Sequence, residues 1–402
     1  MIKKYFLWVS LAFVVSLIYS RFMVSVSMIV MVVLAIAETK YDSNFKFSSF
    51  LKNLPYSGLL LVFGVVFFSG INSVDQSAWL HQVKLKLPFL VLPFAFYMLN
   101  PINEKAHRWI HMGLIGVLLV SSLQVIGIFY LDYEAISSGI NRGKSIPTPI
   151  DHIHYSIILA YATVSCFVLG ILTFTKKWRM FLFLAGLYLF GYCHFLSVRT
   201  GLALCYAGIG VTLLWYVISQ KKYLIGFCVA ALIVILPFVA YHTIKPFHNK
   251  IQYMMWDIEQ YQKGEGKNYS DSERLMSCEI AIDMIKDAPI FGHGIGDLRP
   301  LTTLKHKEKY GVKEKYIYPH NQYLYVLTAI GILGALIFFF GLFCPLLFTA
   351  ERNIFVILIF VMLMLSFLVE NTIQRAVITA FFLFFILLNL SVDLKTRPEK
   401  LD

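Results

Sequence analysis

The stretch YPHNQYLYVLTAIGILGALIFF, from Tyr318 to Phe339, decides the fold class of this chain. It opens with polar residues that include His320 and Asn321, and nearly every later side chain is apolar. A run of this length and composition predicts a helix that crosses a lipid bilayer. The histidine then lies where water meets the membrane. Polar residues gathered at such a boundary are where a function is sought.

The rest of the 402-residue chain has the same apolar character. Hydrophobic residues make up 58% and charged residues only 14%, against about 25% charged residues in a soluble domain. The mean hydropathy is +0.70. The ten-residue alternation of an outer-membrane barrel is not seen. We therefore predict an all-α integral membrane protein.

The pattern predicts about twelve transmembrane helices in three blocks. Residues 1–241 hold the first nine, 242–318 form one long structured loop, 319–392 hold the last three, and 393–402 form a tail. The fourth helix is short and contains two prolines, so the count carries an uncertainty of one. The helices are expected to begin near Tyr5, Phe22, Tyr56, Leu87, Trp109, His154, Met180, Leu202, Tyr223, Tyr323, Asn353 and Ala376.

The basic residues predict the orientation in the membrane. With a cytoplasmic N-terminus, the inner segments hold sixteen Lys and Arg and the short outer loops seven, Lys84 and Lys86 among them. This bias places both termini in the cytoplasm and the long loop outside. It also explains the net charge of +12 without a nucleic-acid partner. The apolar N-terminus is longer than a cleaved signal peptide, and Arg21 divides it, so we expect a retained helical hairpin.

The six cysteines show no CxxC pair and no zinc spacing. No HExxH metal motif and no GxxxxGK[ST] nucleotide loop is present either. We therefore expect no disulfide framework, no metal and no nucleotide cofactor.

The long loop is expected to contain two helices. Residues 250–261 place Ile251, Met254, Met255 and Ile258 on one face, which predicts a short amphipathic helix. A second helix should start near Ser270, because Ser270 and Glu273 have the spacing of a capping box.

The predicted topology brings several polar residues to the outer side. The strongest candidates are Arg199 in a very short turn, Arg274 in the loop, and His320. Each has a structural alternative: Arg199 can reach lipid head groups, Arg274 can be a solvated helix residue, and His320 can cap a helix. Glu370 can likewise form a bridge with Arg375. The wider group is Arg142, Asp151, His152, His154, Asn321 and Glu370.

Two arginines and a histidine at head-group level point to a particular chemistry. Guanidinium groups bind phosphates through paired hydrogen bonds and keep their charge. Histidine can accept a proton from a hydroxyl near neutral pH. These residues suit a transfer reaction in which a lipid diphosphate is the leaving group, and such a donor needs no ATP.

Four segments resemble the O-antigen ligase and O-antigen polymerase superfamily of bacterial envelope proteins. They are SVRTG at 197–201, SERLMSCEIAIDMIKDAPIFGHGIGD at 272–297, the stretch at 318–339, and ENTIQRAVITAFFLFF at 370–385. The family often has Ser-Arg where this chain has Ser197-Val198-Arg199, which leaves the register of Ser197 open.

The resemblance implies a C-type glycosyltransferase architecture in the bacterial inner membrane, with the active site on the periplasmic side. It implies a metal-independent, inverting transfer of glycan from undecaprenyl diphosphate to a hydroxyl of the lipid A core. The family's functional residues correspond to Arg199, Arg274 and His320. Substrate-binding roles are expected more weakly for Arg142, Asn321 and Glu370.

Three other functions remain open from the sequence. The same motifs serve a polymerase that extends lipid-linked repeat units, and an enzyme that glycosylates protein hydroxyls. A lipid-linked glycan transporter is the alternative of another class. Transporters place ionisable residues near the middle of the membrane, whereas the polar residues here gather at one side.

Overall fold

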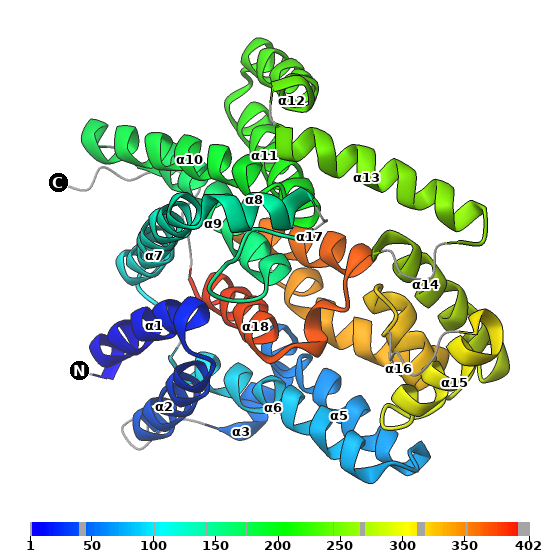
Figure 1. The fold of residues 1–402 in the computed structure, drawn as a ribbon. Coiled ribbons are helices and arrows are strands. Elements are labelled where there is room, and N and C mark those ends of the chain that lie inside the picture. Colours follow the sequence, from blue (N-terminus) through cyan, green and yellow to red (C-terminus); the bar gives the residue numbers. More distant parts are fainter. Residues whose placement is uncertain are drawn as a thin grey trace.

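The computed structural model describes residues 2–39, 46–99, 101–141, 144–173, 175–243, 245–265, 270–311, 318–349 and 353–392. Within these ranges every regular element is a helix (Figure 1). Eight helices of the described residues are long and apolar enough to cross a membrane, and three shorter apolar helices accompany them. The predicted all-α, multi-pass membrane fold is confirmed at this level.

An apolar helix occurs at each of the twelve predicted positions. These helices are α1 (Ile2–Tyr19), α2 (Arg21–Thr39), α5 (Leu60–Phe68), α6 (Gln76–Leu99), α7 (Glu104–Leu131), α9 (His152–Leu172), α10 (Lys176–Leu196), α11 (Arg199–Gln220), α12 (Tyr223–Thr243), α16 (Gln322–Leu347), α17 (Ile354–Val369) and α18 (Ala376–Leu390). The shorter elements between them are α3 (Phe47–Lys52), α4 (Leu54–Ser57), η1 (Ser69–Asn72), α8 (Tyr133–Asn141) and η2 (Thr372–Gln374).

The fourth predicted helix was placed wrongly at its start. Helix α6 begins at Gln76 rather than near Leu87, and Pro88 and Pro93 lie inside it. It therefore contains Lys84 and Lys86, which the sequence had assigned to an outer loop. The side chain of Lys86 is completely buried.

The centre of the molecule is formed by α9 and α18 (Figure 1). Helix α9 packs against α7, α10, α11 and α17. Nearly every side chain of α18 is buried, including a run of four phenylalanines at 381–382 and 384–385. Apolar side chains pack around these two helices. The helix ends that carry the candidate residues are therefore held by a rigid core.

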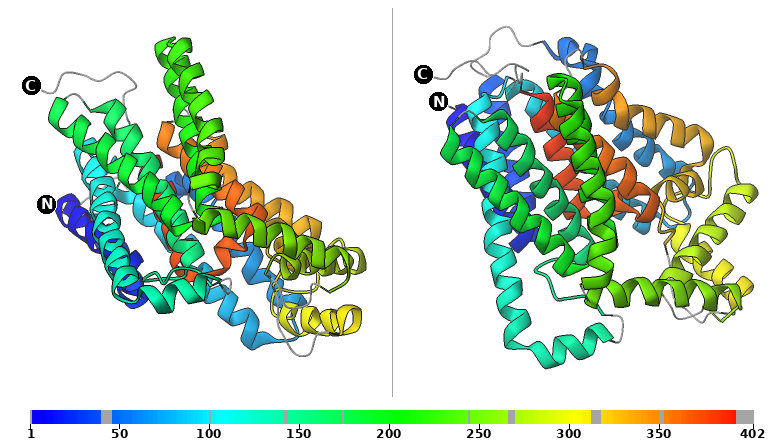
Figure 2. Two further views of the ribbon diagram at one scale, coloured as in Figure 1. Left: turned by 45° about the horizontal axis from the view of Figure 1, so that its top comes forward. Right: turned by 90° about the horizontal axis from the view of Figure 1, so that it is seen from above.

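The helix ends define two faces. Helices α8 and α13 (Lys245–Gln262) lie across one end of the bundle (Figure 2), which we call the outer face. The start of α1 and the end of α18 lie at the opposite end, the inner face. Helix α9 runs from the outer to the inner face.

The segment after α12 contains three helices, one more than predicted. They are α13, α14 (Ser270–Asp287) and α15 (Leu298–Tyr310). The buried carboxylate of Asp257 on α13 accepts hydrogen bonds from the backbone N–H groups of Asp271 (2.8 Å) and Ser272 (3.2 Å). A residue from the preceding helix thus satisfies the exposed N–H groups at the start of α14.

A backbone contact fixes this segment to α16. Gly292 and Gly331 both have positive φ, at 69° and 63°, and a side chain on Gly331 would come within 2.2 Å of the Ile290 carbonyl oxygen. The backbone N–H of His293 donates to Thr328 O (3.0 Å), and that of Gly294 to Ala329 O (2.9 Å). The glycines of GHGIG (292–296) therefore provide a tight backbone path, and they set α14 against α16.

Candidate functional site at the outer face

The outer face has an open pocket of about 990 Å³. Arg199, the first residue of α11, and Arg274 on α14 both line it, although 75 positions separate them in the chain. Asp151, which caps α9, lies in the same wall. Its other lining residues come mainly from 144–153 and from α13. The structure thus brings the two candidate arginines to one open pocket.

His320 is connected to this pocket through Glu370. Its Nδ1 lies 3.5 Å from Glu370 Oε1, and Arg274 Nη2 lies 3.9 Å from Glu370 Oε2. At these distances the contacts are electrostatic and not close hydrogen bonds. The predicted alternative of a Glu370–Arg375 bridge is not found among the described residues, because His320 and Arg274 are the partners of this carboxylate.

The carboxyl of Glu370 is 9% exposed. Burial alone raises its pKa, but the contact and charge of His320, with the charges of Arg274 and His154, outweigh burial and lower the pKa below its ordinary value. Glu370 is therefore ionised at neutral pH. An ionised carboxylate beside Nδ1 favours the tautomer with the proton on that nitrogen, which leaves Nε2 of His320 free to accept a proton.

Arg199 has a partner that the sequence did not suggest. Both of its terminal nitrogens donate to the Asp271 carboxylate, at 2.9 and 2.8 Å. Asp271 is itself held by the bond from its backbone N–H to Asp257. No pattern in the sequence indicates this pair, because it joins two helices 72 positions apart.

Lys86 is a second residue that the sequence missed. Its Nζ donates to the Ile373 carbonyl oxygen (2.5 Å) and to Gln374 Oε1 (3.2 Å). The neighbouring N–H of Ile373 donates to Gln322 Oε1 (3.2 Å). These bonds hold the segment that begins with Glu370 against α6 and α16. A lysine flanked by leucines, directly before the predicted start of an apolar helix, is the signal that could have singled it out.

Asn321 and the outer histidines have mainly structural contacts. The Asn321 side chain caps α16 by accepting from the Leu324 N–H (3.0 Å), and it donates to the Leu368 carbonyl oxygen (3.1 Å). His293 contacts the Met284 carbonyl oxygen at 2.8 Å, so its ring has a backbone partner. His154 lies 3.7 Å from Asp151. Arg142 lies outside the described residues.

The described residues contain no group of three or more His, Cys, Asp or Glu side chains arranged to hold a metal ion. The functions of Arg199, Arg274, His320, Asn321 and Glu370 are predictions, which the geometry makes specific.

Comparison with known proteins adds one finding. Residues 184–339 match the family model described as O-antigen ligase. No curated protein sequence matches the chain. The matched segment includes Arg199, Arg274 and His320, and Glu370 lies beyond it. The segment from α10 to α16 is therefore similar to the O-antigen ligase family, which covers ligases and polymerases, as its motifs had indicated.

Proposed function

We propose that this protein is a glycosyltransferase that moves a glycan from undecaprenyl diphosphate to a hydroxyl of the lipid A core. The observation that supports the proposal most strongly is the single pocket lined by Arg199 and Arg274. Two guanidinium groups at head-group level suit the two phosphates of such a donor. The family match supports transfer of a lipid-linked glycan in general.

The diphosphate engages the two arginines in different ways. Arg274 has only a loose contact with Glu370, so its guanidinium is available to a phosphate at once. Arg199 is bound to Asp271 through both terminal nitrogens, so the donor displaces this carboxylate or shares the guanidinium with it. Once both arginines hold the diphosphate, they offset the negative charge that grows on it as it leaves.

The transfer is a single displacement with His320 as the general base. The acceptor oxygen attacks the anomeric carbon, the bond from that carbon to the diphosphate oxygen breaks, and the acceptor proton passes to Nε2 of His320. The diphosphate departs with the bonding electrons, and the configuration at the anomeric carbon inverts. Glu370 orients the imidazole and stabilises the imidazolium that forms.

The architecture and orientation belong to the same proposal. The twelve apolar helices form a C-type glycosyltransferase scaffold in the bacterial inner membrane. Both termini face the cytoplasm and the outer face is periplasmic, in keeping with the bias of basic residues toward the inner segments. The acceptor core and the lipid-linked donor are both accessible from that side.

The test uses the full-length protein in detergent with a lipid-linked glycan and core lipopolysaccharide. Arg274→Ala and His320→Ala are expected to lower the transfer rate by about a hundredfold or more. Arg299→Ala is the matched control, because Arg299 is an arginine of the outer segment that does not line the pocket. Full transfer by well-expressed Arg274→Ala and His320→Ala proteins would refute the site. Activity without sealed vesicles separates an enzyme from a transporter.

The acceptor is read from the product of the same assay. Glycan that appears on the core supports the ligase. Glycan that appears only as longer chains on the carrier lipid overturns the ligase in favour of the polymerase, and transfer to a protein hydroxyl overturns it in favour of protein glycosylation.

A further inference from the structure

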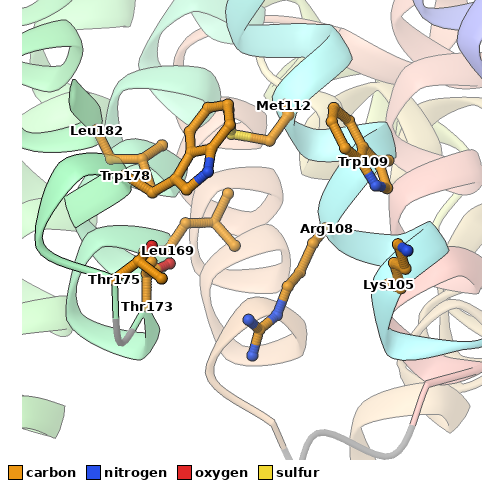
Figure 3. A pocket seen from close by; sticks show the side chains of 9 residues that line it. All are labelled: Lys105, Arg108, Trp109, Met112, Leu169, Thr173, Thr175, Trp178 and Leu182. Carbon is orange, nitrogen blue, oxygen red and sulfur yellow. The ribbon is translucent and has the colours of Figure 1, made fainter. Parts of the chain in front are cut away.

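A second pocket lies at the inner face, far from the candidate site. It has a volume of about 220 Å³ and lies between the start of α7, the end of α9 and the start of α10 (Figure 3). Helix α9 reaches both pockets: Ile153 lines the outer one and Leu169 the inner one. Because 16 positions separate Ile153 and Leu169, the two pockets are about 24 Å apart along α9, most of the roughly 30 Å thickness of a bilayer core.

The wall of the inner pocket is divided into a charged part and an apolar part. Lys105 and Arg108 of α7 supply two cations, and Met112, Leu169 and Leu182 supply an apolar surface. Figure 3 shows the guanidinium of Arg108 in the space between α7 and two threonines, Thr173 at the end of α9 and Thr175 at the start of α10. Such a wall suits a molecule that is anionic at one end and apolar at the other.

The cations of this pocket are available to a ligand. Arg108 uses one terminal nitrogen for Glu104, at 2.5 Å, and a guanidinium has further N–H groups to donate. Lys105 is exposed, and none of the described acidic side chains lies within 4.0 Å of its amine. Arg179 stabilises the rim through two bonds to the Thr173 carbonyl oxygen, at 3.1 and 2.8 Å.

Two tryptophans place the pocket at the membrane surface. Trp109 and Trp178 are both about half exposed, at 47% and 48%, and both line the pocket (Figure 3). Tryptophan is enriched at the level of lipid head groups, where its ring is partly in the membrane and partly in water. The anionic end of a ligand here is therefore at head-group depth, with its apolar end toward the acyl chains.

We propose that this pocket binds the phosphate head group of an anionic phospholipid of the inner leaflet, and that Lys105 and Arg108 select it over zwitterionic lipid. Basic pockets between membrane helices on this side of a bilayer are suited to such head groups. The site is separate from glycan transfer, and only its place in the inner leaflet rests on the membrane orientation given with the proposed function.

The two tryptophans supply the readout. Full-length protein is reconstituted in nanodiscs with either brominated phosphatidylglycerol or brominated phosphatidylcholine, because bromine on the acyl chain quenches a nearby tryptophan. The wild type is expected to prefer phosphatidylglycerol by about fivefold for each basic side chain near the membrane surface, and so by up to about thirtyfold for Lys105 and Arg108 together. Lys105→Gln/Arg108→Gln is expected to abolish the preference, and Trp178→Phe to reduce the lipid-specific quenching.

The control variant removes two positive charges from the inner face, as Lys105→Gln/Arg108→Gln does, but outside the pocket. Lys221→Gln/Lys222→Gln alters two lysines at the inner end of α11 that do not line the pocket, and it is expected to keep the preference. Arg108→Lys keeps the charge and is expected to keep most of it. Equal quenching by both lipids, or a preference that survives Lys105→Gln/Arg108→Gln, overturns the proposal. Loss of the preference on adding soluble glycerol phosphate also overturns it, because the site then binds a small anion.

Discussion

The Arg199–Asp271 pair allows two roles of Asp271 to be separated. Asp271 either competes with the donor diphosphate for Arg199 or orients Arg199 toward the donor. If the donor diphosphate has to displace Asp271, then Asp271→Asn removes a competitor for Arg199. The pair is bidentate, at 2.8 and 2.9 Å, but the Arg199 side chain is 37% exposed. We therefore assign the pair only about 1 kcal/mol, the upper part of the range for exposed ion pairs. This corresponds to a donor KM about fivefold lower in the variant.

The assay is steady-state glycan transfer at varied donor concentration, with the acceptor saturating. Asparagine keeps the shape of the side chain, and the backbone bond to Asp257 is retained, so α14 stays in place. The unfolding temperature serves as the control for folding. A donor KM that rises in Asp271→Asn, as it does in Arg199→Ala, would show that Asp271 orients the arginine for the donor, and the displacement argument would be wrong.

Three further predictions follow from the packing around the site. Lys86→Met leaves the Ile373 carbonyl unpaired, so we expect the free energy of unfolding to fall by about 1–3 kcal/mol. The kcat should fall as well, with a donor KM within about twofold of the wild-type value. Unchanged stability and kcat would contradict the role of Lys86 in positioning the segment that begins with Glu370. Gly331→Ala should lower the free energy of unfolding by about 1–3 kcal/mol, because Gly331 has a positive φ and lies close to the Ile290 carbonyl. Gly210→Ala is the control, because a Cβ at Gly210 meets open space, and it should leave stability unchanged. Thermal unfolding of the two variants compares them. Because the folded-state pKa of Glu370 is lowered, its contribution to stability is present above its ordinary value of 4.5 and is lost as pH falls through the lower folded value. Glu370→Gln should remove that acid step from a plot of unfolding temperature against pH.

Much of the fold was predictable because apolar runs and their lengths follow directly from the thickness of a bilayer. Each of the twelve predicted runs is a helix in the structure. The start of α6 was missed by eleven residues, because Lys84 and Lys86 were read as signs of a loop. A buried lysine can be part of a helix when backbone carbonyls satisfy it, and the Ile373 carbonyl that does so here is 287 positions away in the chain.

The sequence named the candidate residues of the site, but it could not predict which of them pair with which partners. Motifs identified Arg199, Arg274 and His320, and the topology put them on one side. The partners Asp271 and Glu370 arise from long-range packing: one follows from the cap that Asp257 provides, the other from the end of α17. Such contacts depend on how helices are placed against one another, which local sequence patterns do not specify.

The most direct test of the central claim is an experimental structure of the protein with an undecaprenyl-diphosphate-linked glycan bound. We predict that the diphosphate lies between the guanidiniums of Arg199 and Arg274, with the anomeric carbon toward His320 and the lipid chain leaving toward the membrane. A diphosphate bound away from both arginines, or a sugar that His320 cannot reach, would contradict the account.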